Sequence, residues 1–438
     1  MAQIHIEHDG EPISGEIRVD GGKHAFAHSL ACAALADRGR LTEVPDHVDA
    51  RALREALTLV FDEVYYDAPT RVLTFARPMH RTVIRIGSEL AGRSRNLFCL
   101  LPALLLRADE VAVEAAPQGC RIGTRPTDWY HAVLGRFGVR SRVAADATVL
   151  SWPRRHAADV RFEYPSMTGT VIAVAAAAAA PGHSTIVNAS VEPSCAEQLG
   201  CLRAMGGRVD GGLPAVAIDG GTYDSVEWLI APDRIHAVTY LTAALLTRGR
   251  ARVTASGPLR IPRFVEFLGE AGVRVTEDEH SITAEFPATG NLRPVSLDAG
   301  SEPLFSSDWV TCASLLLAVR GSGPSRISDD VFLGRFQYVE NLVPFGLSGI
   351  GLERSTLRGR EAVIARIDPV SPVLSAGVFG SCADIRGTAT LVLAGLVADG
   401  PCIVSDDFHL RRGYTDLPGD LNALAGHQLI VRAKEVLA

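Results

Sequence analysis

The chain has 438 residues, of which 47% are hydrophobic and 21% are charged, and its formal net charge is −7. This length exceeds what one hydrophobic core usually supports, so we expect two domains or a repeat architecture in a globular protein. The acidic balance argues against binding to a nucleic-acid backbone, which requires clustered Lys and Arg. The same acidic balance disfavours an RNA-end-processing enzyme with a repeat fold.

Membrane insertion, secretion, disulfides and zinc binding are all disfavoured by the sequence. The longest apolar run, 171–181, is mostly alanine and is much shorter than the roughly 20 residues of a membrane-spanning helix. The start of the chain, MAQIHIEHDGEP, lacks the basic end and apolar stretch of a signal peptide. The eight cysteines are scattered without CxxC pairs, as is typical of reduced thiols. We therefore predict a cytoplasmic protein without a bound metal.

One sequence pattern recurs about every 70 residues along the chain. The unit is an Ala/Leu-rich helix, a small polar turn, a short β-branched strand, a loop and an amphipathic helix that ends near glycine. Its six copies begin at Ala25, Asn96, Thr170, Val238, Trp309 and Thr388. Alternating helices and strands predict an α/β protein with three units in each domain, and the Ala-rich helices, apolar nearly all round, should lie in the interior.

The second helix of the unit is predicted to bury one face and to end at a glycine. Apolar residues at three-to-four spacing, for example within 264–271, indicate the buried face. Gly138, Gly206 and Gly272 follow such helices, where a left-handed C-cap is expected, and strand-like sequence resumes after them. The first copy has Asp62 instead of glycine at this place.

The loop 116–128, APQGCRIGTRPTD, carries the most informative chemical pattern. Cys120 lies among glycines and next to Arg121 and Arg125, and nearby cations favour the thiolate form of a cysteine. A loop flanked by glycines can also close over a ligand. The pattern predicts a proton donor or nucleophile at Cys120, and an ordinary buried cysteine stays open as the alternative.

Gly21, Gly22 and Lys23 stand at the start of the first Ala-rich helix. Backbone N–H groups at a helix N-terminus attract anions, and a lysine adds a point charge, so this loop predicts a phosphate contact. It is not a Walker P-loop, because the first glycine and the Ser or Thr after the lysine are missing. A plain turn with a solvated lysine is the alternative for the loop taken alone.

Three loops of the C-terminal half carry arginines at equivalent places in the repeat. Arginine binds carboxylate and phosphate groups through two parallel hydrogen bonds, so these loops together with Lys23 and Arg125 predict an anion-binding site. The residues concerned are Arg335, Asp384, Arg386 and Arg412. A solvated side chain is the alternative for each arginine taken singly.

Asp308, in the segment FSSDW, precedes the fifth Ala-rich helix. Ser and Asp are the usual N-cap residues of helices, so a cap is one interpretation of Asp308. A general base is the other interpretation, and it depends on the arginines forming a common site.

Seven segments, in order, resemble the family of UDP-N-acetylglucosamine 1-carboxyvinyltransferases. They are GGK near residue 23, GCRIGTRPTD at 119–128, PDRI at 232–235, FSSDW around 308, GRF at 334, DIRGTATLVLAG at 384–395 and RRGY at 411. The likeness covers nearly the whole chain, and the related 3-phosphoshikimate 1-carboxyvinyltransferases share the fold but lack the cysteine loop. The resemblance implies an EPSP synthase-like fold, an inside-out α/β barrel of two similar domains with six repeated units in all. Residues 1–22 with 233–438 would form one domain, and 23–232, with the cysteine loop and the uridine-binding segments, the other.

The resemblance also implies an activity, the transfer of the enolpyruvyl group of phosphoenolpyruvate to a hydroxyl of a uridine nucleotide, with release of phosphate and without a cofactor. Cys120 would protonate or capture phosphoenolpyruvate, and Asp308 would deprotonate the hydroxyl. Phosphate would be held by Lys23, Arg125 and Arg412, and the carboxylate by Arg335 and Arg386 with support from Asp384. The substrate-binding residues would be Lys23, His24, Arg125, Pro126, Thr127, Asp128, Ser166, Met167, Thr168, Asp308 and Val331.

The chain departs from the family pattern at several positions. The family asparagine after the lysine, the basic residue after Val44-Pro45, the lysine near Ser166 and the glutamate after PDRI are replaced by His24, Val48, Tyr164 and His236. A family arginine aligns with either Arg93 or Arg95. The loss of two basic groups slightly favours uridine monophosphate as the acceptor, as in the enzymes of nucleoside-antibiotic pathways, because an unpaired phosphate is costly. The alternatives are drift within a cell-wall enzyme acting on UDP-N-acetylglucosamine, and a non-catalytic nucleotide-binding protein.

Overall fold

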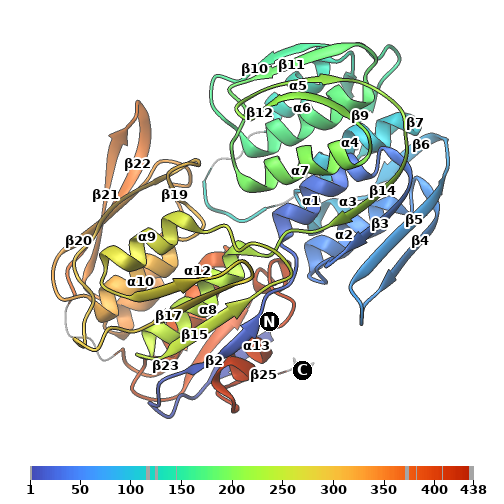
Figure 1. Ribbon diagram of the computed structural model, residues 1–438. Helices are drawn as coiled ribbons and strands as arrows, with labels where there is room; N and C mark the ends of the chain where they lie inside the picture. Colours follow the sequence, from blue (N-terminus) through green and yellow to red (C-terminus); the bar gives the residue numbers. More distant parts are fainter. Residues whose placement is uncertain are drawn as a thin grey trace. The chain divides into compact units, whose positions relative to one another are not determined.

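Six repeats of helix, strand, helix and β-hairpin build the chain (Figure 1). The computed structural model describes residues 2–114, 119–123, 127–144, 146–369, 374–380, 382–406 and 408–433. Unit 1 consists of Met1–Val19, Cys120–Thr124 and Asp233–Ala438, and unit 2 consists of Asp20–Gly119 and Arg125–Pro232. The short segment that carries Cys120 therefore belongs to unit 1, whereas the division expected from the sequence places it with 23–232.

Unit 2 contains the first three repeats. The first has α1 (Lys23–Ala33), β3 (Ala36–Thr42), α2 (Val48–Leu57), β4 (Phe61–Asp67) and β5 (Val72–Pro78). The second has β6 (Arg81–Ile86), α3 (Ser88–Arg93), α4 (Leu97–Leu106), β7 (Ala108–Val113), α5 (Asp128–Arg136), β8 (Arg140–Val143) and β9 (Thr148–Ser151). The third has β10 (Asp159–Arg161), α6 (Met167–Ala179), β11 (His183–Val187), α7 (Pro193–Ala204), β12 (Arg208–Gly212), β13 (Ala215–Asp219) and β14 (Tyr223–Leu229).

The sheets of unit 2 are linked into a closed ring. Their strand orders are β14-β3-β5-β4, β6-β7-β9-β8 and β10-β11-β13-β12. In each sheet a strand that has crossed from the preceding repeat pairs in parallel with the strand that follows the Ala-rich helix. The last crossing strand, β14, returns to the first repeat, with Tyr223 opposite Ala36, and so closes the ring.

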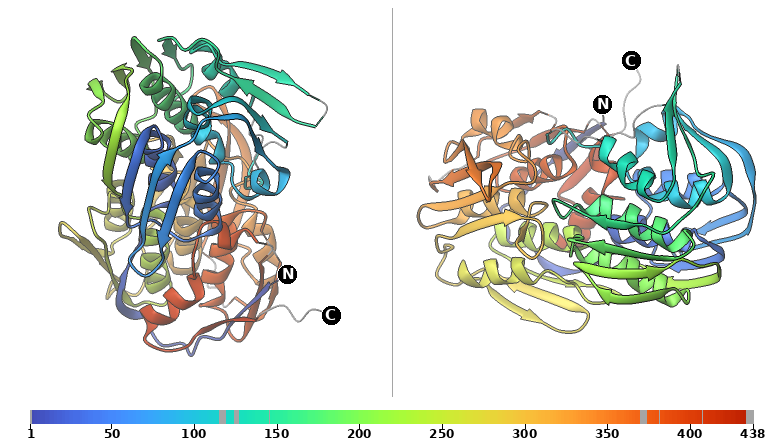
Figure 2. Two further views of the ribbon diagram at one scale, coloured as in Figure 1. Left: turned by 90° about the vertical axis from the view of Figure 1, so that its right-hand side faces the viewer. Right: turned by 90° about the horizontal axis from the view of Figure 1, so that it is seen from above.

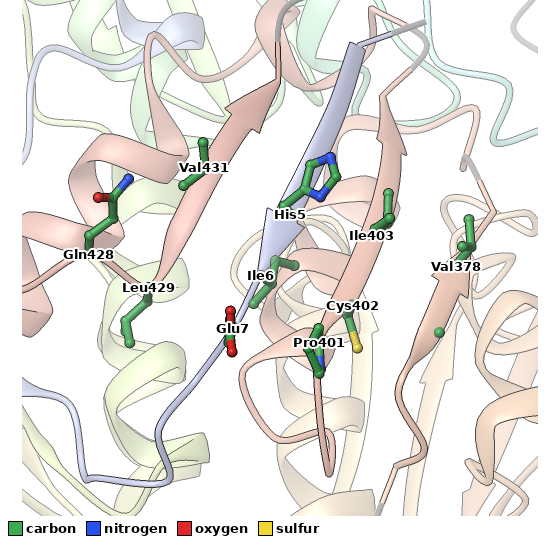
Figure 3. Close-up of a pocket in the computed structure, with 11 residues that line it drawn as sticks. His5, Ile6, Glu7, Val378, Pro401, Cys402, Ile403, Gln428, Leu429 and Val431 are labelled. Carbon is green, nitrogen blue, oxygen red and sulfur yellow. The ribbon is translucent and has the colours of Figure 1, made fainter.

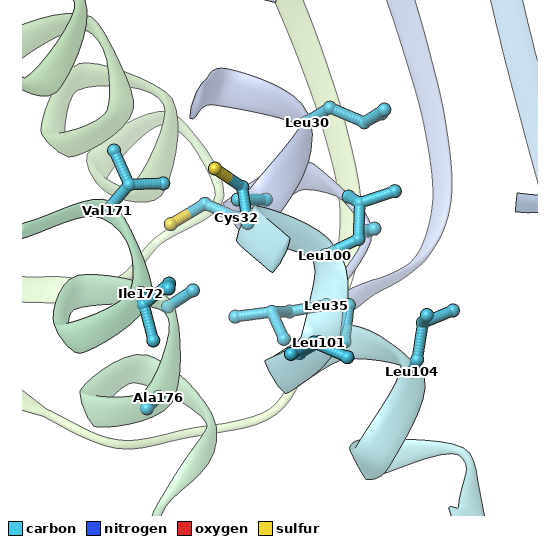
Figure 4. Close-up of a cluster of buried hydrophobic side chains, with 14 of the residues drawn as sticks. Leu30, Cys32, Leu35, Leu100, Leu101, Leu104, Val171, Ile172 and Ala176 are labelled. Carbon is cyan, nitrogen blue, oxygen red and sulfur yellow. The ribbon is translucent and has the colours of Figure 1, made fainter. Parts of the chain in front are cut away.

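The helices α1, α4 and α6 lie at the centre of unit 2 and contact one another (Figure 4). Residues 169–179 of α6 are all buried, and most of the side chains there are alanine. Small side chains let helix axes approach closely, because the interaxial distance, about 8–10 Å in general, depends on the side chains at the contact. The sheets therefore lie outside the helices, which is the inside-out arrangement.

Unit 1 contains the other three repeats. The fourth has α8 (Arg234–Leu246), β15 (Arg250–Thr254), α9 (Pro262–Glu270), β16 (Arg274–Glu277) and β17 (Ser281–Glu285). The fifth has β18 (Ser296–Gly300), β19 (Phe305–Ser306), α10 (Val310–Arg320), β20 (Ser325–Asp329), α11 (Tyr338–Leu342), the 3-10 helix η1 (Val343–Phe345), β21 (Ile350–Leu357) and β22 (Arg360–Ile367). The sixth has β23 (Gly377–Phe379), α12 (Ile385–Gly395), β24 (Cys402–Asp406), η2 (Leu410–Arg412), α13 (Leu417–Ala425) and β25 (Ile430–Ala433), completed by β1 (Ala2–Ile6) and β2 (Ser14–Arg18).

The N-terminal strands complete the ring of unit 1. Its sheets have the orders β16-β17-β15-β2, β19-β18-β20-β22-β21 and β23-β24-β1-β25. Strand β1 lies between β24 and β25 and takes the place of a hairpin strand, so the blue N-terminal strand runs beside the red C-terminal segment (Figure 2). Strand β2 then pairs in parallel with β15, as β14 does with β3. The helices α8, α10 and α12 form the centre.

The predicted repeat, the α/β class and the inside-out barrel are confirmed by these two rings of sheets around central helices. Gly138, Gly206 and Gly272 have φ of +97°, +85° and +92°, the left-handed conformation expected after the second helices. The prediction for Asp62 is wrong, because Asp62 lies inside β4 and the turn before it is formed by 58–60. The described residues contain no helix long and apolar enough to cross a membrane.

A shallow cavity of about 470 Å³ lies on the outer face of the sheet β23-β24-β1-β25 (Figure 3). Val378, Ile403, His5 and Val431 occupy one row across its four strands. None of the predicted site residues lines this cavity.

The turn between α8 and β15 has no room for a side chain. A Cβ on Gly249 would lie 1.8 Å from the carbonyl oxygen of Ile13, whereas a Cβ on Gly269, in α9, would meet no atom within 4 Å. We predict that Gly249→Ala lowers the free energy of unfolding by about 1–3 kcal/mol, because the N-terminal segment that completes unit 1 must move. Gly269→Ala, the matched control, should raise it by about 0.5–1 kcal/mol through helix propensity. Urea denaturation of both variants checks this, and equal stabilities would contradict the close approach.

Candidate active site

Three buried charged side chains and one half-buried carboxylate, that of Asp308, form an Asp–Arg network in unit 1. Arg335 donates to both carboxylate oxygens of Asp384, at 3.0 and 3.1 Å, and from its other terminal nitrogen to Asp308 Oδ1 at 3.0 Å. The Nε of Arg386 donates to the same oxygen of Asp308 at 3.4 Å. The sequence-predicted residues Asp308, Arg335, Asp384 and Arg386 are thus brought together.

The local sequence explains how two of these side chains are oriented. Asp384 is the N-cap of α12 and accepts from the backbone N–H of Gly387 at 3.0 Å, which leaves Arg386 in the first turn of the helix. Asp308 does not cap α10, because the N-cap position is occupied by Trp309. The helix-cap interpretation of Asp308 is therefore wrong, and its carboxylate is engaged by the two arginines instead.

Burial and opposite charges compete in setting the proton affinities of the Asp–Arg network. Burial alone would raise the pKa of Asp384, but Arg335, Arg386, the Gly387 N–H and the Cys120 thiol outweigh it, so the pKa is lowered. Burial would lower the pKa of Arg386, but the surrounding Asp308, Tyr414, Asp233 and Asp384 outweigh it and the pKa is raised. Asp384 and Arg386 are therefore ionised at neutral pH.

Cys120 is packed against the Asp–Arg network. Its thiol is hydrogen-bonded to the carboxylate of Asp384. The backbone on either side is fixed to unit 1, since Arg121 N donates to Ala383 O at 2.9 Å and Gly334 N donates to Ile122 O at 3.1 Å. Cys120 is half-buried, whereas the other seven cysteines are buried.

The charges beside Cys120 differ from those expected from the sequence. We expected Arg121 and Arg125 to favour the thiolate, but the Arg121 side chain is exposed and Arg125 lies outside the described residues. The partner that the structure gives the thiol is Asp384, a carboxylate whose charge is balanced by Arg335. A carboxylate that accepts from the thiol keeps the proton on sulfur, so the arrangement suits a proton donor.

Arg412 and Val331 lie in loops next to the Asp–Arg network. Arg412 is buried at the end of η2, and η2 packs against α12. Val331 follows β20, and its backbone N–H donates to Asp329 at 2.9 Å. Asp329 itself is fully buried and also accepts from Ser307, one residue before Asp308. Asp329 therefore ties the loop of Val331 to the loop of Asp308.

In unit 2, Lys23 is engaged by a carboxylate that the sequence analysis missed. Its Nζ lies 2.5 Å from Asp49 Oδ2, and both side chains are buried. Asp49 stands in the first turn of α2, where an acidic residue is expected for the helix dipole alone. This ordinary explanation hides its role from sequence reasoning, because the partner is set by the packing of α2 against α1.

His24 follows Lys23 on α1 and is half-buried. Its ring stacks on that of His28, one turn further along the helix, with 5.8 Å between the ring centroids. Burial, followed by the proximity of His24, holds the pKa of His28 well below its usual value. His28 is therefore neutral near pH 7, and it supports the ring of His24 from inside the unit.

The predicted uridine-binding segments meet at the N-termini of α5 and α6. Thr127 and Asp128 begin α5, while Ser166 caps α6 by accepting from Gly169 N at 3.3 Å. A Cβ on Gly169 would lie 2.2 Å from the Trp129 ring, so the two helix starts are in close contact. Met167 and Thr168 are half-buried in the first turn of α6. The predicted residues Arg125 and Pro126 lie outside the described residues.

The two arginines that align with one family arginine have different surroundings. Arg93 pairs with Glu55 of α2 at 2.8 Å. Arg95 instead reaches the hydroxyl of Tyr130 at 3.4 Å, and its guanidinium lies 5.4 Å from the centre of that ring. Tyr130 is next to Trp129, so Arg95 is the one that belongs to the predicted uridine-binding region. No group of His, Cys, Asp or Glu in the described part of the chain could hold a metal ion.

Comparisons with known proteins identify the class to which this fold and site belong. The chain is 32% identical to UDP-N-acetylglucosamine 1-carboxyvinyltransferase of Mycobacterium leprae over 94% of this chain and 96% of that protein. It is 31% identical to the protein of the same name from Nocardia farcinica over 97% of this chain and 98% of that protein. The solved enolpyruvyl transferase NikO from Streptomyces tendae superimposes with a TM-score of 0.83 at 25% identity over 99% of both chains. An EPSP synthase from Acinetobacter baumannii shares the fold, with a TM-score of 0.72 at 15% identity over 99% of this chain and 100% of that one.

These likenesses define an enolpyruvyl transferase. The family described as EPSP synthase (3-phosphoshikimate 1-carboxyvinyltransferase) matches residues 8–421. The chain belongs to the EPSP synthase family.

We predict that removing the central cation of the Asp–Arg network destabilises unit 1. Arg335→Met should lower the free energy of unfolding by about 3–5 kcal/mol, because it leaves the buried Asp384 and the half-buried Asp308 without their shared partner. Asp384→Asn keeps an acceptor for Gly387 and removes the charge. In the double variant the losses should not add, with a coupling energy of about 1–3 kcal/mol from urea denaturation.

The pair Arg366 and Glu353, also joined by two hydrogen bonds, is the matched control because it is exposed in the hairpin β21–β22. Water screens its charges, so a cycle of Arg366→Met and Glu353→Gln should show much weaker coupling. Equal coupling in the two pairs would contradict the importance of burial.

Proposed function

We propose that this protein transfers the enolpyruvyl group of phosphoenolpyruvate to a hydroxyl of a uridine nucleotide and releases phosphate. The observation that carries the proposal is the half-buried thiol of Cys120, hydrogen-bonded to Asp384 within the Asp–Arg network. This arrangement supplies an acid, a carboxylate base and fixed cations, which are the groups that the addition of an alcohol to an enol ether requires.

The proposed reaction proceeds by addition and elimination. Cys120 donates its proton to carbon 3 of phosphoenolpyruvate while the acceptor oxygen bonds to carbon 2, and Asp308 takes the proton of the acceptor hydroxyl. The resulting tetrahedral intermediate breaks its bond between carbon 2 and the phosphate oxygen. Phosphate leaves with the electrons of that bond and takes the proton held by Asp308, and carbon 3 returns a proton to the Cys120 thiolate so that the double bond forms again.

The buried arginines of unit 1 are suited to an anionic substrate. Arg335 Nε is a buried donor for which no acceptor occurs among the described residues. A buried unsatisfied donor costs about 1–3 kcal/mol, so an anion that accepts from it gains affinity. We propose that Arg335 and Arg386 bind the carboxylate of phosphoenolpyruvate, and that Lys23, Arg125 and Arg412 bind its phosphate.

We propose uridine monophosphate as the acceptor. The supporting observation is the replacement of two basic residues in the predicted acceptor region of unit 2. Val48 and Tyr164 occupy positions where the resemblance expects basic residues. A monophosphate requires fewer cations than a diphosphate, because each unpaired phosphate carries a desolvation cost.

UDP-N-acetylglucosamine is the second candidate acceptor. It is supported by the names of the relatives that share 31–32% identity with nearly the whole chain. A binding protein without activity is a weaker candidate, because Cys120, Asp308 and their arginines are assembled in unit 1.

We predict that Cys120→Ser loses most of the phosphate release from phosphoenolpyruvate, since a hydroxyl is a far poorer acid and nucleophile than a thiol. Iodoacetamide should label one cysteine of the native protein, and the label should be absent from this variant. Released phosphate and intact mass are the measurements.

Cys402→Ser is the control for Cys120→Ser, since Cys402 is buried in β24. It should lose some stability and keep its turnover. Turnover of Cys120→Ser near the wild-type rate would refute the role of Cys120 in the chemistry.

We predict that uridine monophosphate supports turnover with a kcat/KM at least about tenfold above that of UDP-N-acetylglucosamine, the effect of one charge-assisted contact. In Val48→Lys/Tyr164→Lys the ratio should move toward the diphosphate sugar, because added cations interact more strongly with two phosphates than with one. Steady-state kinetics with both nucleotides measure the ratio.

The control is Val83→Lys/Tyr65→Lys, which adds the same two charges at exposed positions of unit 2, 47% and 66% exposed. It should leave the ratio unchanged. A wild-type preference for UDP-N-acetylglucosamine would show that the second candidate is right and that the lost basic groups are drift.

A further inference from the structure

The loop that carries Arg412 is held by the first turn of α8. His236 Nε2 lies 2.8 Å from the carbonyl oxygen of Gly413, the residue after Arg412. A carbonyl oxygen can only accept, so Nε2 must carry the hydrogen of this bond. His236 is buried, with 8% of its surface exposed, and the bond is therefore shielded from water.

A second anchor lies beside the first. The imidazole of His236 stacks on the ring of Tyr414, with 4.3 Å between the centroids and 11° between the planes. The hydroxyl of Tyr414 is 2.7 Å from Thr239 Oγ1, one turn further along α8. Two successive turns of α8 thus hold two successive residues of the loop.

The opposite side of the loop rests on α12. A Cβ on Gly413 would lie 2.6 Å from the Ile385 side chain and 3.5 Å from Arg386 Nη1. The backbone next to Arg412 is therefore held between His236 and the first turn of α12, where the Asp–Arg network begins. A side chain on so constrained a backbone loses less entropy when it binds an anion.

We infer that His236 is a positioning residue, which holds Arg412 in the orientation that binds the phosphate of phosphoenolpyruvate. The inference rests on the proposed function, in which Arg412 is a phosphate ligand. His236 stands at the position where the resemblance expects a glutamate. Asp233, the nearest carboxylate, is 3.9 Å from His236 Nε2 and caps α8.

The test distinguishes the contribution of the N–H donor of His236 from that of its aromatic ring. His236→Phe keeps a ring against Tyr414 and loses the N–H donor, so the Kd and KM for phosphoenolpyruvate should rise about tenfold while the KM for the nucleotide stays within about twofold. His236→Gln keeps an N–H donor and should recover most of this loss. An unchanged Kd in His236→Phe would overturn the inference.

Coupling to Arg412 distinguishes positioning from general damage. In the Arg412→Ala background, His236→Phe should have no further effect on the Kd for phosphoenolpyruvate, measured by calorimetry. If both effects add fully, His236 does not act through Arg412 and the inference is wrong.

Tyr240→Phe is the matched control on the same helix. Tyr240 donates to Asp420 of α13 at 2.5 Å, so this variant also removes a buried hydrogen bond of α8 but none to the loop of Arg412. It should lower the melting temperature and leave the Kd unchanged. An equal rise of the Kd for phosphoenolpyruvate in His236→Phe and Tyr240→Phe would show that His236 has only a structural role.

The proposed function can fail separately from this inference. If the wild type binds phosphoenolpyruvate in a manner that depends on His236 and Arg412 but releases no phosphate with any uridine nucleotide, the acceptor proposal is wrong and the positioning role stands. If the wild type does not bind phosphoenolpyruvate, both are wrong.

Discussion

The need to bury helices that are apolar all round governs the architecture of each unit. A helix such as α6, with 169–179 entirely buried, cannot lie on a surface, so its whole circumference must be covered. Three such helices packed together leave only their outward sides to be covered by sheets. Because a gap between the sheets would expose the helices, the ring of sheets must close, and β14 and β2 are the strands that close it.

The same constraint determines where the chemistry can lie. Buried helices leave their ends as the places where polar groups reach solvent, and a helix N-terminus offers unpaired N–H groups and a positive dipole end. Lys23 begins α1, Ser166 caps α6, Asp308 precedes α10 and Asp384 caps α12. The predicted site residues thus stand at the helix starts, where the fold itself favours negative charge.

Much of the fold could be predicted because its signals are local and periodic. The repeat, the apolar helices and the glycines at 138, 206 and 272 each follow from residues close together in the sequence. Asp62 was misassigned because its turn ends in the right-handed conformation and leaves no glycine signal. The closing roles of β1 and β2 were not predicted, since strands from opposite ends of the chain share no local pattern.

The site was predictable in its residue types and not in its pairings. Asp308, Arg335 and Arg386 were recognised as loop residues, but only packing shows that one oxygen of Asp308 serves both arginines. Asp49 was missed, and Tyr414 was recognised only as part of the segment RRGY, because an acid in a first helical turn and an aromatic residue in a loop have ordinary explanations. Asp49 is 26 residues from its partner Lys23, and Tyr414 is 178 residues from its partner His236.

The departures from the family pattern are unevenly distributed between the units. Val48, Tyr164 and His24 lie in unit 2, whereas His236 is the departure in unit 1. In unit 1 the replaced residue still makes a specific contact, the hydrogen bond to Gly413, and the groups that would handle phosphoenolpyruvate remain assembled. In unit 2 two of the three changes, Val48 and Tyr164, remove a positive charge that the resemblance expects near the predicted acceptor. This pattern does not fit a binding protein without activity. In such a protein, substitutions would affect the thiol and the arginines as readily as the acceptor region. The distribution fits the proposed change of acceptor with an unchanged donor, because the enolpyruvyl donor and the nucleotide make separate demands on charge.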